Sequence, residues 1–171
     1  MIKVQDLKNL AIAFSGPSNS GKTTLIVKLA EKLKEKYKLA IVKHDPGDKA
    51  VFDKEGKDSW KFSQTGADVV IASPTRTTLF SKKHKKLHEI IDMLDEFDFL
   101  FVEGLKTLSL PRISVFRNSM DESYFEYSNA LAVDNSVKLD DYDIPARIDI
   151  LDLNDTDSIL EWIFKNAKRV K

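Results

Sequence analysis

Eight consecutive residues carry the clearest chemical signal in the sequence. They match the pattern G-x-x-x-x-G-K-[ST] and read Gly16-Pro17-Ser18-Asn19-Ser20-Gly21-Lys22-Thr23. In this pattern the glycines let backbone N–H groups turn inward around phosphates, the lysine adds an ammonium, and the hydroxyl can ligate Mg²⁺. The segment therefore predicts a phosphate-binding loop, with Lys22 as its catalytic cation. The residues expected to bind the nucleotide are Gly16, Ser18, Asn19, Ser20, Gly21, Lys22, Thr23 and Thr24.

A magnesium-dependent phosphate site also needs an acidic residue at the end of another strand. Glu103 directly follows the most apolar run of the chain, Phe99–Val102. Thr23 and Glu103 are therefore the predicted metal ligands. Asp98 stands at the opposite end of the same run, and we expect a structural role for it.

The elements that must position these residues follow from the alternation of short apolar runs with longer amphipathic ones. This alternation predicts an α/β fold, in which helices flank a mainly parallel sheet, organised as a single P-loop NTPase domain over residues 1–171. The expected strands are Leu10–Phe14, Leu39–Val42, Val69–Ala72, Thr77–Phe80, Phe99–Val102, Ile113–Phe116, Ala130–Val133 and Ile148–Ile150. The expected helices start near Thr23, Asp58, Leu87 and Asp155. The segment Lys43–Lys57 is expected to be a loop.

Composition excludes several classes of function. The 27 basic and 27 acidic residues balance, which argues against nucleic-acid or anionic-membrane binding as the main activity. The chain has no Cys, so disulfides, thiolate nucleophiles and Cys-based metal sites are excluded. No run approaches the ~18 apolar residues of a membrane span, and the N-terminal residues do not resemble a secretory signal. We expect a cytoplasmic protein.

Three further sets of residues could contact ligands. Asp134 follows the strand Ala130–Val133, where GTPases place the aspartate that pairs with guanine, although the usual Asn and Lys before it are missing; an ordinary loop residue is the alternative. In the loop after Leu39–Val42, Asp45 or Asp53 could hold Mg²⁺ or orient a water, which makes them catalytic candidates. A set of basic residues after Glu103 could bind a second phosphate-bearing molecule or a protein partner, or could form an ordinary polar surface. This set is Lys106, Arg112 and Arg117.

Several segments, taken in order, resemble one family. They are Lys43-His44, the run from Asp53 to Ser59, Gly66-Ala67, Ser73-Pro74, Val102-Glu103-Gly104-Leu105-Lys106 and Leu110-Pro111-Arg112-Ile113. Together with the phosphate-binding loop, they are similar to molybdopterin-guanine dinucleotide biosynthesis protein B (MobB). The resemblance implies a small, usually dimeric adaptor that binds GTP and Mg²⁺ and hydrolyses GTP weakly. Its implied partners are the guanylyltransferase that attaches GMP to molybdopterin, and molybdopterin or its dinucleotide.

The sequence departs from the family pattern at one place, and two alternative functions remain. Family members often carry more histidines after the Lys-His pair, whereas here Asp45-Pro46-Gly47 follows, which puts any role of those histidines in doubt. A small-molecule or nucleotide kinase is the alternative function, but no arginine-rich lid is visible between Leu110 and Asn129. A nickel-type metallochaperone shares the expected fold but would rely on Cys and His clusters.

Overall fold

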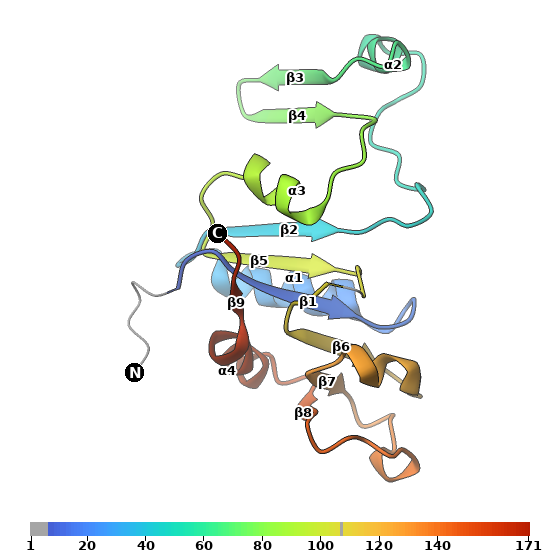
Figure 1. Ribbon diagram of the computed structural model, residues 1–171, viewed down its shortest axis with the longest axis vertical. Helices are drawn as coiled ribbons and strands as arrows, with labels where there is room; N and C mark the ends of the chain where they lie inside the picture. Colours follow the sequence, from blue (N-terminus) through green and yellow to red (C-terminus); the bar gives the residue numbers. More distant parts are fainter. Residues whose placement is uncertain (1–6, 107) are drawn as a thin grey trace. The chain divides into compact units, whose positions relative to one another are not determined.

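The structure is a computed structural model that describes residues 7–106 and 108–171 (Figure 1). Its internal contacts divide the chain into two compact units. The first unit combines the N-terminal part through His44 with Leu94–Lys171, and the second unit comprises Asp45–Met93. The expectation of a single domain over 1–171 stays a prediction.

Within the described residues, the sheet of the first unit has seven strands. They are β1 (Leu10–Ser15), β2 (Leu39–Lys43), β5 (Phe99–Glu103), β6 (Arg112–Phe116), β7 (Ala130–Val133), β8 (Asp149–Asp152) and β9 (Lys168–Arg169). Six of them lie in the order β2-β5-β1-β6-β7-β8 with every neighbouring pair parallel, while β9 pairs antiparallel with β1. The predicted α/β class with a mainly parallel sheet is confirmed.

Two hydrophobic clusters hold this sheet from opposite faces. On one face, helices α1 (Lys22–Leu33) and α4 (Thr156–Asn166) bury apolar side chains against strand residues such as Ile12 and Phe101. On the other face, the alternate residues of β7, Leu131 and Val133, pack with the 3₁₀ helix η2 (Glu122–Tyr127). A second 3₁₀ helix, η3, spans Leu139–Asp141. Both faces of the sheet therefore carry packed apolar side chains, on the second face at β6 and β7.

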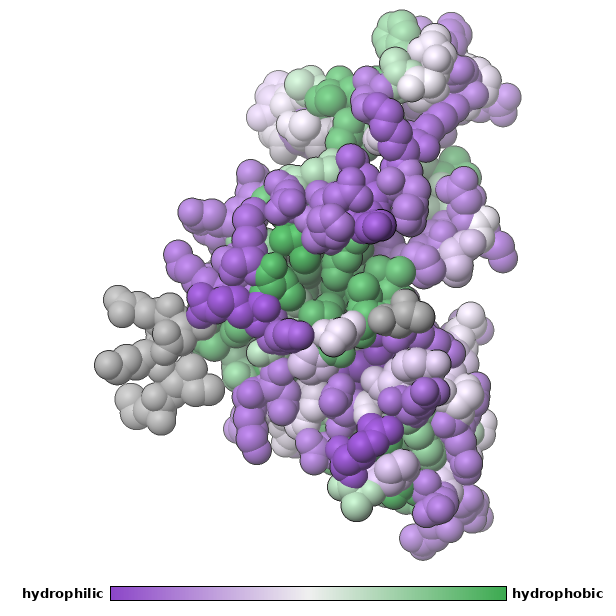
Figure 2. Space-filling model, viewed as in Figure 1, coloured by the Kyte–Doolittle hydropathy of each residue, from purple (hydrophilic) through white to green (hydrophobic). Residues whose placement is uncertain are grey.

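The second unit is small and built around a hairpin. It contains α2 (Asp58–Gln64), the antiparallel strands β3 (Val69–Ser73) and β4 (Arg76–Phe80), and α3 (Leu87–Met93). The hairpin forms a two-stranded sheet of its own. Large apolar side chains are exposed on this unit (Figure 2), among them Val51, Phe52, Phe62 and Val70. Across the parts of the chain that the structure describes, no helix combines the length and apolar character needed to cross a membrane.

Candidate nucleotide-binding site

The loop between β1 and α1 has a backbone that depends on glycine. Gly16 and Gly21 have φ values of +134° and +96°, and Asn19 between them has φ +62°. A Cβ on Gly16 would lie 2.3 Å from the carbonyl oxygen of Val115, far inside van der Waals contact. Gly21 is also the residue from which α1 begins, so the loop leads into a helix N-terminus, which attracts anions.

Lys22 lies across this loop. Its ammonium donates a hydrogen bond of 2.7 Å to the carbonyl oxygen of Pro17. Burial lowers the pKa of Lys22 from its ordinary value, and the charge of Lys43 acts in the same direction, while Glu103 opposes both. The ammonium is thus a partly desolvated cation placed at the phosphate-binding loop, and a phosphate oxygen could replace the Pro17 carbonyl as its acceptor.

The loop also holds a hydroxyl that lacks a partner. Ser20 is buried, and its Oγ atom has no hydrogen-bond partner among the described residues. A buried donor without an acceptor costs roughly 1–3 kcal/mol, and an anion in the loop would supply the acceptor. The backbone before the loop is held by buried hydroxyls, because Ser15 is hydrogen-bonded to Ser114 at 2.7 Å and Ser114 to Ser128 at 2.6 Å. The residues present therefore fit a phosphate group.

Glu103 lies at the same edge of the sheet as the loop. In the strand register it pairs with Phe14 of β1 and with Lys43 of β2, and the next amide, of Gly104, donates to the Phe14 carbonyl at 2.9 Å. Thr23 lies in the first turn of α1 at the end of the loop. No cluster of three or more His, Asp or Glu side chains suited to a metal occurs in residues 7–106 and 108–171. Mg²⁺ typically uses one or two protein oxygens together with phosphates and waters, so Thr23 and Glu103 fit this pattern.

The structure buries Arg112, which was expected either on an ordinary polar surface or on a surface that binds a ligand or a protein partner. Both expectations are wrong. Arg112 is 1 % exposed, and burial lowers the pKa of its guanidinium. The guanidinium donates to the carbonyl oxygens of Gly104, Leu105 and Leu108 at 3.0, 2.9 and 3.3 Å. Arg112 therefore fixes the loop that follows Glu103, and it does so from inside the protein.

Arg117 and Asp134 form an ion pair beside the phosphate-binding loop. The Arg117 Nε atom lies 3.2 Å from Asp134 Oδ2. The same Nε atom lies 3.4 Å from the position that a Cβ on Gly21 would take, so the guanidinium faces the loop backbone. The other carboxylate oxygen of Asp134, Oδ1, accepts from the Ser136 amide at 3.0 Å and from the Ser136 hydroxyl. The sequence placed both residues after strands, but their pairing depends on the adjacency of β6 and β7.

The catalytic candidates Asp45 and Asp53 lie in the second unit. The Asp45 carboxylate accepts from the backbone amides of Gly47, Lys49 and Ala50 at 3.4, 2.7 and 2.6 Å, and so organises a turn. Asp53 accepts from the Ser59 hydroxyl at 2.8 Å through Oδ1, while its buried Oδ2 has no partner among the described residues. Their catalytic roles stay predictions.

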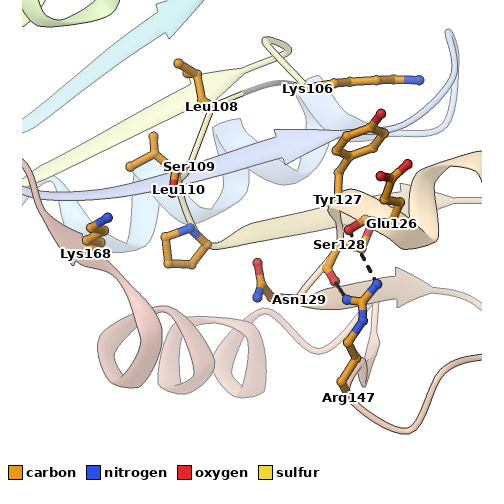
Figure 3. A pocket seen from close by; sticks show the side chains of 11 residues that line it. Lys106, Leu108, Ser109, Leu110, Glu126, Tyr127, Ser128, Asn129, Arg147 and Lys168 are labelled. Atoms are coloured by element: carbon orange, nitrogen blue, oxygen red, sulfur yellow. Dashed lines mark hydrogen bonds between the residues drawn. The ribbon is translucent and has the colours of Figure 1, made fainter.

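A cavity of about 560 Å³ lies at the other edge of the first unit, next to the residues that precede β6 and β7 (Figure 3). Three of its lining residues are cationic. Lys106 and Lys168 lie on opposite sides of the cavity, and the Lys106 ammonium lies 3.5 Å from the centre of the Tyr124 ring. Arg147 donates to the carbonyl oxygens of Ser128 and Phe125. These cations do not converge on one point.

In this parallel sheet, strand β1 leads through a glycine-dependent phosphate loop into helix α1, and an acidic residue ends the neighbouring strand β5. This arrangement defines a P-loop NTPase fold. The model of the family described as Molybdopterin guanine dinucleotide synthesis protein B (MobB) matches residues 11–135. The chain belongs to this family.

Related proteins agree with the family assignment. The chain is 31 % identical over 160 residues to a molybdopterin-guanine dinucleotide biosynthesis adapter protein of Haemophilus influenzae, covering 89 % of this chain and 86 % of the relative. It is 31 % identical over 168 residues to the adapter protein of that name in Escherichia coli, covering 90 % and 93 %. A crystal structure of molybdopterin-guanine biosynthesis protein B superimposes with a TM-score of 0.68 at 26 % identity, covering 91 % of this chain and 99 % of that one.

Proposed function

We propose that this protein is a GTP-binding adaptor in molybdopterin guanine dinucleotide biosynthesis, which acts beside the guanylyltransferase and hydrolyses GTP slowly with Mg²⁺. The observation that carries the proposal is the glycine-dependent loop at the end of β1, with Lys22 across it and Glu103 at the same edge, in a chain of the MobB family. The family relatives that cover most of the chain are named as adapter proteins.

In this proposal the loop binds the phosphates of GTP. The amides of the loop and the unpartnered Ser20 hydroxyl donate to phosphate oxygens, and the Lys22 ammonium exchanges the Pro17 carbonyl for a phosphate. Thr23 and Glu103 would hold Mg²⁺, which neutralises phosphate charge when bound. Asp134 is the candidate to recognise guanine, and Asp45 or Asp53 to orient a water. Ser18, Asn19 and Thr24 complete the expected nucleotide contacts.

The proposed partners are the guanylyltransferase, molybdopterin or its dinucleotide, and a second copy of the chain. The proposed location is the cytoplasm. Support for a protein partner comes from the second unit, where Phe52 and Val70 are 84 % and 60 % exposed. Exposed large apolar side chains that gather on one small unit favour an interface over a solvated surface. The hairpin β3–β4 adds strand edges that another strand could extend.

The nucleotide part of the proposal is tested by isothermal titration with GTP and with ATP, each with Mg²⁺. We expect selective binding of GTP, and we expect Lys22→Ala to weaken it at least about tenfold, since a charge-assisted hydrogen bond contributes roughly 1.5–3 kcal/mol. Lys28→Ala is the matched control, because Lys28 is exposed on the same helix. Equal affinity for ATP would remove the guanine part, and an unchanged affinity in Lys22→Ala would remove the phosphate-loop part.

A further inference from the structure

The ion pair between Arg117 and Asp134 connects two parts of the nucleotide-binding site. Arg117 directly follows β6 and Asp134 directly follows β7, and the last residues of these parallel strands, Phe116 and Val133, are register partners. Both side chains therefore start at the carboxyl edge of the sheet, where α/β proteins bind ligands. The Asp134 side chain is 19 % exposed and the Arg117 side chain 44 %.

The carboxylate of Asp134 has little remaining hydrogen-bonding capacity. Oδ1 accepts both the amide and the hydroxyl of Ser136, and the Asn118 amide holds that hydroxyl in turn at 2.8 Å. Oδ2 faces Arg117 Nε at 3.2 Å. The pKa of Asp134 lies below its ordinary value, mainly through the Ser136 hydroxyl, with the Ser136 amide and the charge of Arg117 adding to it against desolvation. The group is thus a carboxylate with Oδ2 already engaged by a cation.

The guanidinium of Arg117 also faces the phosphate-binding loop. Its Nε, Cζ and Nη2 atoms lie 3.4, 3.6 and 3.8 Å from the position of a Cβ on Gly21. Guanidinium carries five N–H donors, and within the described residues its Nη groups donate no hydrogen bond. A cation this close to the position of a Cβ on Gly21 has donors to offer to a phosphate bound at the loop.

A guanine base and Arg117 would compete for the same oxygen. Guanine presents N1–H and N2–H donors, which a carboxylate accepts, and Ser136 already occupies Oδ1. Adenine presents an acceptor at N1 and one amino donor group at N6, so it cannot place two adjacent donors on Asp134 as guanine does. A base that displaces Arg117 leaves the guanidinium tethered beside Gly21, next to the phosphates.

We propose that Arg117 couples recognition of guanine to binding of the phosphates. When guanine binds Asp134 Oδ2, Arg117 leaves that oxygen and binds a phosphate oxygen instead. This inference rests on the proposed function, since it assumes a guanine nucleotide at this site. It makes Arg117 a residue that determines specificity, because only a base with donors at N1 and N2 releases the guanidinium. Binding of the two halves of the nucleotide is then cooperative, and cooperativity between two ligands is reciprocal.

The experiment measures the affinity of inorganic pyrophosphate, with Mg²⁺, in the presence and absence of guanosine, which is used near its solubility limit as the probe of the base site. For the unmodified protein we expect guanosine to tighten pyrophosphate binding by about five- to tenfold, the lower range of typical couplings. Adenosine at the same concentration should leave the affinity unchanged. In Arg117→Ala the guanosine effect should disappear. Lys168→Ala, which removes an exposed cation at the other edge of the same unit, should keep it.

Two outcomes overturn the proposal. Pyrophosphate affinity in the unmodified protein that does not respond to guanosine would show that the two halves bind independently. A guanosine effect that persists in Arg117→Ala would show that another group carries the coupling. If instead the unmodified protein binds neither GTP nor pyrophosphate, the proposed function itself fails. A thermal unfolding curve of Arg117→Ala, compared with Lys168→Ala, separates loss of coupling from loss of the fold.

Discussion

Replacing Gly16 by alanine tests the phosphate-binding loop at its most constrained residue. A Cβ at this position would lie 2.3 Å from the Val115 carbonyl oxygen, and φ is +134°, a conformation that L side chains rarely adopt. Val115 belongs to β6, so its carbonyl cannot move without disturbing the sheet. The substitution therefore strains both the loop and its neighbouring strand.

The magnitude follows from two separate costs. A non-glycine residue in such a backbone conformation costs roughly 1–3 kcal/mol, and forcing extra atoms into a packed site costs roughly 1–3 kcal/mol more. Gly16→Ala should therefore lower the free energy of unfolding by about 2–6 kcal/mol. Gly21→Ala is the matched control. At φ +96° it has the strain alone, because the nearest atom, Nε of the half-exposed Arg117 side chain, lies at an ordinary 3.4 Å.

Urea unfolding followed by tryptophan fluorescence measures the difference. In a Trp60→Phe background the signal comes from Trp162, which is buried in α4 of the first unit. Gly16→Ala should unfold at a clearly lower urea concentration than Gly21→Ala. If the two variants lose equal stability, or if Gly16→Ala loses less than about 1 kcal/mol, the close approach of the loop to β6 is refuted.

Three further predictions concern other parts of the chain. Arg112→Met should destabilise the protein by about 2–4 kcal/mol, because three partly buried carbonyls lose their donor. It should also speed amide exchange at Leu105 and Leu108, and unchanged exchange would contradict the role of Arg112. Asp155→Ala should lower the urea midpoint, because Asp155 caps α4. The pKa of Asp155 is lowered, mainly by the Ser158 hydroxyl. The stabilisation by Asp155 is therefore present above the unfolded pKa of about 3.9 and is lost as pH falls through the folded pKa. A stability difference between the unmodified protein and Asp155→Ala that persists below the folded pKa would refute this prediction. Leu79→Lys, on the exposed face of the hairpin, should convert a dimer to a monomer in light scattering, while a protein that is monomeric without the substitution would refute the dimer.

The sequence predicted the main sheet and the loop because both depend on local patterns. Apolar runs such as Phe99–Val102 are fully buried as expected, and Glu103 lies beside β1 because parallel strands bring their carboxyl ends to one edge. The hairpin could not be assigned to a separate sheet from the sequence, because Val69–Ala72 is as apolar as a buried strand but forms a small sheet of its own with Arg76–Phe80.

The side-chain pairings could not be predicted, because they depend on contacts between distant segments. Arginine is normally exposed, so nothing in the local sequence marks Arg112 as buried; three carbonyls of a preceding loop decide it. The pairing of Arg117 with Asp134 follows from the adjacency of β6 and β7, which the sequence does not specify. The signal that could have suggested it is the position of both residues directly after strands.

We propose above all that this protein assists a guanylyltransferase through its nucleotide site. The most direct measurement adds the protein, unmodified or as Lys22→Ala, to a purified molybdopterin guanylyltransferase reaction and follows formation of the dinucleotide. We expect the unmodified protein to increase dinucleotide formation and to associate with the enzyme, and we expect Lys22→Ala to lose the increase. No effect of either protein, together with no physical association, would contradict the claim.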